Sequence, residues 1–151
     1  MSVQAKDPFI WEDESWTFLG AEDVYSLFDP EQYGLHPSPR TTNCWKGFVI
    51  QFALRNKELF LDELHVYCED NVYPEVAGIP PVSIDDYGAR YKDIHHKLDY
   101  SGTITIGQEY LDRYIGRCFT GPHMYGKVHE LVFENGVLQS DSDTSGQYQG
   151  F

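Results

Sequence analysis

The sequence predicts a mainly β fold with a minor α+β character: an antiparallel sheet curled into a sandwich or a partial barrel, with one short helix. Three observations support this prediction. Apolar and polar residues alternate in several stretches, turn residues join these stretches in pairs, and 15% of the residues are aromatic. Alternation places one face of a strand in the core, and aromatic side chains pack well on such a half-buried surface.

Two short apolar and aromatic stretches, Ser15 to Leu19 and Val24 to Phe28, come first in the predicted domain. The turn residues Gly20 to Asp23 separate them, so we expect two small strands. The next stretch, up to Arg40, is rich in proline, which lacks the N–H group that helices and central strands use. We therefore expect an ordered loop that crosses the domain.

The clearest pattern lies in residues 46–68. Every second residue from Phe48 to Leu54 is apolar, so one face of this strand is expected to be buried. Asn56 and Lys57 then reverse the chain, and the returning stretch is apolar on both faces in places. This pattern predicts a β-hairpin at the centre of the sheet.

The second half of the chain contains less regular patterns. Residues 69–90 carry prolines, glycines and acidic residues without periodicity, and we expect a surface loop there. Alternation within residues 97–106 predicts a strand, and apolar residues at helical spacing predict a short amphipathic helix near residues 108–116. Residues 127–138 contain the pair Asn135-Gly136, which favours a type I′ turn and so predicts a second hairpin.

The 151 residues fit one domain, which is long enough to bury a core without metals or disulfides. We expect an acidic N-terminal arm over residues 1–14, one β-rich domain over residues 15–138, and a polar, flexible tail over residues 139–151. Three cysteines without a CxxC pair are typical of free thiols in a reducing compartment. No apolar run resembles a signal peptide or a membrane span, so the expected location is the cytoplasm.

The charge of the chain bears on its partners. There are 24 Asp and Glu residues against 11 Lys and Arg, which gives a formal net charge of -13. The acidic residues are spread along the chain, and such a surface repels nucleic acids and anionic membranes but attracts basic proteins. We therefore expect no nucleic acid and no membrane as partner. The plainer alternative is that the acidity only keeps the protein soluble.

Candidate catalytic and metal-binding residues are few. The six histidines form no HxH or HExxH motif, and no GxSxG, P-loop or GxGxxG motif occurs. Asp93 and His95 would share one face of a strand, and together with His129 they are the candidates for a pocket or a metal site. The cysteines stand in apolar surroundings rather than beside a base. We name no catalytic residue and expect no cofactor; whether the chain is an enzyme stays open, with a non-enzymatic role favoured.

One segment resembles part of a known group of proteins. Residues 41–48, Thr-Thr-Asn-Cys-Trp-Lys-Gly-Phe, are similar to a Thr/Ser-x-Cys-Trp-Arg-Gly-Tyr segment that precedes a strand pair in a group of small uncharacterised bacterial proteins. The similarity extends over residues 15–138, with Lys46 in place of the group's arginine and Gly116 in place of a histidine. The group brings no established activity. The residues that carry the match are Cys44, Trp45, Gly47 and Phe48. We interpret them as a structural motif where two backbones approach closely.

These observations favour a non-enzymatic, acidic module that binds a basic protein, for example an immunity or antitoxin-type inhibitor in a bacterial cytoplasm. The expected contact residues are Asp70, Asp85, Asp86 and Tyr87, because an aromatic side chain beside carboxylates is typical of an interface anchor. Two alternatives stay open: a small-ligand-binding protein or metal-dependent enzyme with a pocket inside the curled sheet, and a structural, self-assembling protein. The oligomeric state stays open as well.

Overall fold

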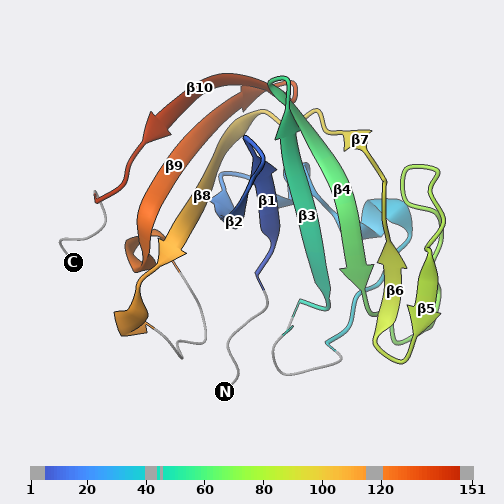
Figure 1. Cartoon of the computed structure of the whole chain (residues 1–151). Helices are drawn as coiled ribbons and strands as arrows, with labels where there is room; N and C mark the ends of the chain where they lie inside the picture. The colour runs from blue at the N-terminus through green and yellow to red at the C-terminus, as the bar shows by residue number, and fades with distance from the viewer. Residues whose placement is uncertain (1–5, 40–43, 45, 115–120, 147–151) are drawn as a thin grey trace.

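A computed structural model describes residues 6–39, 44, 46–114 and 121–146, which fold around one sheet of ten strands (Figure 1). The strands are β1 (Pro8–Trp11), β2 (Glu14–Ala21), β3 (Phe48–Arg55), β4 (Glu58–Val66), β5 (Ser83–Asp85), β6 (Gly88–Tyr91), β7 (His96–Lys97), β8 (Gly102–Tyr110), β9 (Tyr125–Glu134) and β10 (Val137–Asp143). The described helices are α1 (Val24–Leu27) and the 3-10 helices η1 (Pro30–Tyr33), η2 (Asp112–Tyr114) and η3 (Pro122–Met124). The predicted mainly β fold with one short α-helix is confirmed. No helix in these ranges is long and apolar enough to cross a membrane.

The sheet curls so that its two halves meet at one end. Its order is β10-β9-β8-β2-β1-β3-β4-β6-β5, with β7 paired to β4. Val137 at the start of β10 pairs with Glu58 at the start of β4, and the rest of β10 follows β9 away from β4 (Figure 1). The backbone N–H of Leu138 donates to the carbonyl of Lys57 at 2.7 Å and strengthens this closure. The fold is therefore a partial barrel, closed at the end where β10 crosses to β4.

Strand β1 connects the two halves of the sheet. It pairs antiparallel with β2 and parallel with β3, so the sheet is mixed rather than purely antiparallel. Phe9 is fully buried, and Trp11 is 9% exposed. The expected N-terminal arm over residues 1–14 is therefore wrong for residues 8–14, which form β1, its turn and the start of β2. A stretch of four residues that begins with proline shows too little alternation to reveal a strand, and its long-range pairing with β3 creates one.

The two predicted hairpins form, and their turn residues explain their geometry. Asn56 and Lys57 join β3 to β4 with φ angles of 51° and 65°, and Asn135 and Gly136 join β9 to β10 with 50° and 77°. Positive φ at both central residues is the requirement of a type I′ turn, whose twist matches that of the flanking strands. Gly136 meets a second requirement, because a Cβ there would lie 1.8 Å from the carbonyl oxygen of Leu98.

The helix expected near residues 108–116 is absent from the described part of that range, apart from the single 3-10 turn η2. Strand β8 extends to Tyr110, whose ring packs against Tyr125 of β9 with centroids 5.3 Å apart. Cross-strand aromatic packing therefore outweighs the helical spacing of apolar residues. The α-helix forms instead at Val24–Leu27, where a strand was expected, because Asp23 caps it by accepting a hydrogen bond from the N–H of Ser26 at 3.2 Å.

Two further segments are more ordered than expected. The stretch 69–90 contains β5 and most of β6, which pair as a hairpin. Strand β10 continues to Asp143, and Thr144 is only 4% exposed, so the expected flexible tail is wrong for residues 139–144. The sequence gives no sign of this order because the outer residues of β10 are polar, and their partners lie on β9.

The core fills the inside of the curl. Alternate residues of β3 and β4 point inward and meet residues of β8 and β9 from the other half of the sheet. These inward residues include Ile50, Phe52, Leu54, Leu59, Leu61, Ile104, Ile106, Leu131 and Phe133. The outward residues of β3, β4 and β6 include the polar residues Gln51, Glu63, His65 and Arg90.

Candidate functional site

The residues predicted to bind a partner gather at one edge of the sheet. Asp85, Asp86 and Tyr87 lie at the turn of the β5–β6 hairpin, and β5 is the last strand in the sheet order (Figure 1). Asp85 and Asp86 line a hollow of about 320 Å³ together with Glu69. Asp70 follows Glu69 in the chain. The fold therefore brings the two acidic segments of the prediction together.

Large apolar side chains are exposed on the same segment. Of the eight exposed large hydrophobic residues in the described ranges, four lie between residues 72 and 87: Val72, Val82, Ile84 and Tyr87, which are 51–60% exposed. All three residues of β5 are exposed, and within the described ranges its outer edge pairs with no strand. We call this surface the acidic edge; it comprises Glu69, Asp70, Val72, Val82, Ile84, Asp85, Asp86 and Tyr87.

Local contacts give the acidic edge a fixed shape. The carboxylates of Asp70 and Asp85 each accept a hydrogen bond from the backbone N–H two residues ahead, at 3.1 and 2.8 Å. Such turns order the loop, and each uses only one oxygen of the carboxylate, Oδ1. The hydroxyl of Tyr91 donates to the carbonyl of Pro74 at 2.7 Å, and burial raises the pKa of Tyr91 to about 12. Tyr91 thereby ties the loop of the acidic edge to β6.

The candidates Asp93 and His95 do not lie on a strand. They belong to the link between β6 and β7, and both have positive φ angles, of 54° and 46°. His95 Nδ1 lies 3.2 Å from Oδ1 of Asp62, and its Nε2 lies 3.5 Å from Oδ1 of Asp93. Arg55 binds both oxygens of Asp62. A guanidinium therefore takes the place that a metal ion would need at this carboxylate.

The third candidate, His129, belongs to a different cluster. It lies on β9, where its Nδ1 contacts Oδ1 of Asp141 at 2.7 Å. The indole rings of Trp11 and Trp16 pack edge-on against its imidazole, with centroids 5.3 and 5.1 Å away. The structure therefore does not join His129 to Asp93 and His95 in one site. No three His, Cys, Asp or Glu residues of the described ranges are arranged to hold a metal ion.

Asp141 also lines an open cavity of about 660 Å³ at the closed end of the partial barrel. The turns β1–β2 and β3–β4 contribute charged residues of both signs to its lining, which also contains apolar residues. Its lining consists of Ile10, Trp11, Glu12, Asp13, Leu54, Arg55, Asn56, Lys57, Leu138 and Asp141. The lining contains no Ser, Thr or Cys nucleophile, so the Asp141–His129 pair has no hydroxyl or thiol here to activate.

The segment expected to be structural contains a close backbone approach. Gly47 has φ 83°, and a Cβ on it would lie 2.8 Å from the backbone nitrogen and oxygen of Ser38. The thiol of Cys44 lies 3.6 Å from the carbonyl of Phe48, and burial raises the pKa of this thiol. A raised pKa keeps the sulfur protonated and unreactive. Trp45 lies outside the described residues.

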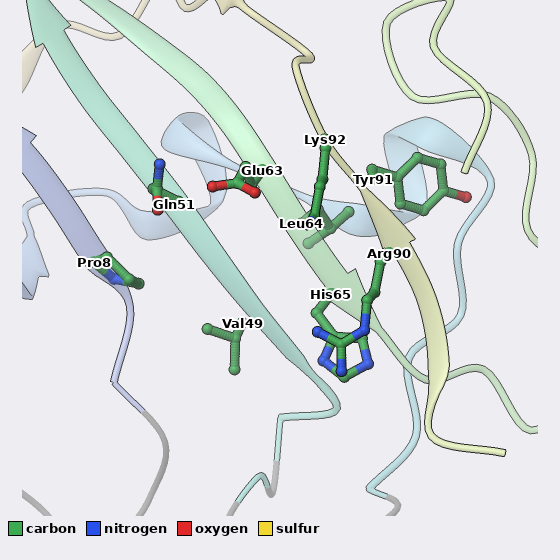
Figure 2. Close-up of a pocket in the computed structure, with 9 residues that line it drawn as sticks. All are labelled: Pro8, Val49, Gln51, Glu63, Leu64, His65, Arg90, Tyr91 and Lys92. Carbon is green, nitrogen blue, oxygen red and sulfur yellow. The ribbon is translucent and has the colours of Figure 1, made fainter. Parts of the chain in front are cut away.

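Sequence reasoning missed a polar depression on the outer face of the sheet. Three neighbouring strands contribute to it: β3 with Val49 and Gln51, β4 with Glu63 and His65, and β6 with Arg90, followed by Lys92 (Figure 2). Its volume is about 150 Å³, and Pro8, Leu64 and Tyr91 complete the lining. Across the strands, Gln51 pairs with Glu63, and His65 pairs with both Val49 and Arg90. The sequence signal was two polar residues two positions apart, Glu63 and His65 in β4, and again Arg90 in β6 and Lys92 directly after it. Only the strand register places the two pairs side by side.

The polar side chains of this depression have few partners. Within the described ranges, Gln51, Glu63, Arg90 and Lys92 have no side-chain hydrogen bond and no ion pair. Nε2 of His65 is buried without a hydrogen-bond partner. Burial lowers the pKa of His65, and the positive charge of Arg90 lowers it further, while a hydrogen bond to the backbone of Tyr87 acts in the opposite direction.

Comparisons of the chain with protein families, with curated proteins and with solved structures give no significant match.

Proposed function

We propose that this protein is a non-enzymatic binding module whose acidic edge covers a basic surface of another protein. The observation that carries this proposal is the coincidence of exposed apolar residues and carboxylates on the acidic edge. Exposed apolar groups such as Ile84 and Tyr87 release water on binding, and the surrounding carboxylates select a basic partner.

The charge of the whole chain supports the same proposal. A net charge of -13 attracts a basic partner over distances of about one Debye length, roughly 8 Å at physiological salt. The acidic edge adds orientation, because its carboxylates surround an aromatic side chain that can anchor the complex. An inhibitor of a basic toxin is the specific form of this function that we propose.

The test is capture of a partner from the lysate of the native host at low and at high salt, with the purified chain as bait. The double variant Asp85→Asn/Asp86→Asn removes two charges from the acidic edge and keeps the side-chain oxygens that form the turn. Its matched control, Glu12→Gln/Asp13→Asn, removes two exposed charges from the β1–β2 turn. We expect the wild-type chain and the control to retain one basic protein at low salt, and the Asp85/Asp86 variant to release it.

Equal retention by the two double variants would remove the acidic edge from the proposal. Failure of the wild-type chain to retain any basic protein would contradict the proposed function itself.

A further inference from the structure

We infer that the outer depression between β3, β4 and β6 binds one small oxyanion, of the size of phosphate or a carboxylate group, and that Arg90 and His65 hold it. This inference does not depend on the proposed function, because it concerns other side chains and a ligand of opposite charge, although the depression adjoins the acidic edge.

The first argument concerns which lysines and arginines form ion pairs. Four lysines and arginines of the described ranges form ion pairs with carboxylates: Lys46 with Asp7, Arg55 with Asp62, Lys97 with Glu58 and Asp99, and Lys127 with Glu109. Arg90 and Lys92 form no such pair with a described residue, although both line the same depression. The fold therefore keeps two positive charges together and uncompensated by an ion pair at one place on an acidic protein.

The second argument is the half-buried imidazole of His65 on β4, which lies between β3 and β6. Nε2 of His65 has no partner, and a buried polar atom of this kind normally has one. A hydrogen bond to the backbone of Tyr87 raises the pKa of His65 and so favours its protonated form. Nε2 is then the ring nitrogen of His65 that is left without a hydrogen-bond partner. When protonated, it donates a hydrogen bond to an anion.

The third argument is the match between these donors and an oxyanion. The register places Arg90 directly opposite His65, and Figure 2 shows the two side chains next to each other at one end of the depression. A guanidinium binds two oxygens of one phosphate or carboxylate, and the imidazolium adds a third hydrogen bond. The volume of about 150 Å³ admits one such group and is smaller than the pockets of about 300 Å³ or more that hold larger ligands.

Two carboxylates act against the anion. Glu63 lines the depression, and the charge of Asp85 reaches His65 from the β5–β6 hairpin. Lys92 lies two residues after Arg90 and also lines the depression, so two permanent cations face two carboxylates. A proton on His65 adds a third positive charge, and only then do the cations outnumber the carboxylates. Binding therefore takes up a proton at His65. Affinity falls as the pH rises above the pKa of His65 in the complex.

The test is an NMR titration of the full chain with inorganic phosphate and, separately, with acetate, at constant ionic strength kept with sodium chloride. The ring signals of His65 report binding and protonation. We expect saturable shifts with at least one of the two anions and a higher pKa of His65 in its presence. Arg90→Gln should weaken binding by about tenfold or more, equivalent to about 1.4 kcal/mol.

The matched control is Arg113→Gln, which removes the same charge from η2, outside the depression. It should bind the anion as the wild-type chain does. If neither anion gives a saturable shift at millimolar concentration, or if Arg90→Gln and Arg113→Gln bind equally, the inference is wrong. Unchanged backbone spectra of both variants show that the fold is intact, so each result can be assigned to the site.

Discussion

Arg55 at the end of β3 holds the buried carboxylate of Asp62 on β4 through two hydrogen bonds, of 2.5 and 2.9 Å. Asp62 is 7% exposed and lies where the β3–β4 register shifts, between the pairs Gln51–Glu63 and Phe52–Leu61. Its carboxylate raises the pKa of the Arg55 guanidinium. A buried carboxylate is costly without a partner of opposite charge. The register shift places Asp62 in a buried position, and Arg55 supplies that partner.

Removal of Arg55 should therefore destabilise the fold. We expect Arg55→Gln to lower the free energy of unfolding by about 1–3 kcal/mol, because it leaves the Asp62 carboxylate without its bidentate partner. Urea denaturation measures this loss. The control Lys57→Gln removes a nearby charge that forms no ion pair with a described residue and should change stability little. The double variant Arg55→Gln/Asp62→Asn should recover part of the loss; no recovery would contradict the importance of the unpaired charge.

Gly136 and Gly78 both adopt a positive φ angle, but only Gly136 also lacks space for a Cβ atom. Both have positive φ, of 77° and 81°, but a Cβ on Gly136 would meet the carbonyl of Leu98, whereas a Cβ on Gly78 meets nothing within 4 Å. We expect Gly136→Ala to cost about 2–4 kcal/mol and Gly78→Ala only about 1 kcal/mol. Denaturation of the two variants side by side measures the difference. Equal costs would mean that the contact with Leu98 does not constrain the turn.

The lowered pKa of His65 predicts a pH dependence of stability. Because the native chain disfavours the charged imidazole, the unfolded chain binds a proton first as the pH falls below the ordinary pKa of 6.5. The contribution of neutral His65 to the free energy of unfolding is fully present above that pH and is lost as the pH falls. Between about pH 7.5 and about pH 5.5, His65→Gln should therefore lose less stability than the wild-type chain.

Arg90→Gln should reduce the same loss, since the charge of Arg90 is the second cause of the lowered pKa. His96→Gln, at an exposed histidine of β7, serves as the control. Urea denaturation at both pH values provides the measurement. A wild-type loss identical to that of His65→Gln would show that other groups alone carry the pH dependence.

Tyr87 should anchor the partner of the acidic edge. It is 57% exposed beside Asp85 and Asp86, and burial of an aromatic anchor contributes strongly to binding. Once the basic partner is purified, Tyr87→Ser should weaken its binding by about tenfold or more, mainly through faster dissociation. Tyr25→Ser is the matched control, because Tyr25 is 74% exposed on α1, outside the acidic edge. Surface plasmon resonance gives both rates, and equal dissociation from the two variants would exclude Tyr87 as an anchor.

Local sequence patterns were sufficient for the hairpins and for the fold class. Asn56-Lys57 and Asn135-Gly136 adopt positive φ because of their own residue types, and the alternation in β3 directs Phe52 and Leu54 to the core wherever the strand is placed. The sequence alone also identified the acidic residues that we propose to contact a partner, Asp70, Asp85 and Asp86. Their gathering at one edge of the sheet was not visible.

Local patterns failed where a distant segment competed with them. Helical spacing near Tyr110 yields to packing against Tyr125, and residues 8–11 become a strand because β3 pairs with them. His65 and Arg90 lie 25 positions apart in the printed numbering, and only the β4–β6 register places them opposite each other. The sequence by itself thus determined turns, alternation and net charge, which depend on neighbouring residues. The tertiary structure decided strand order and both candidate sites, because these depend on contacts between segments whose pairing no local pattern specifies.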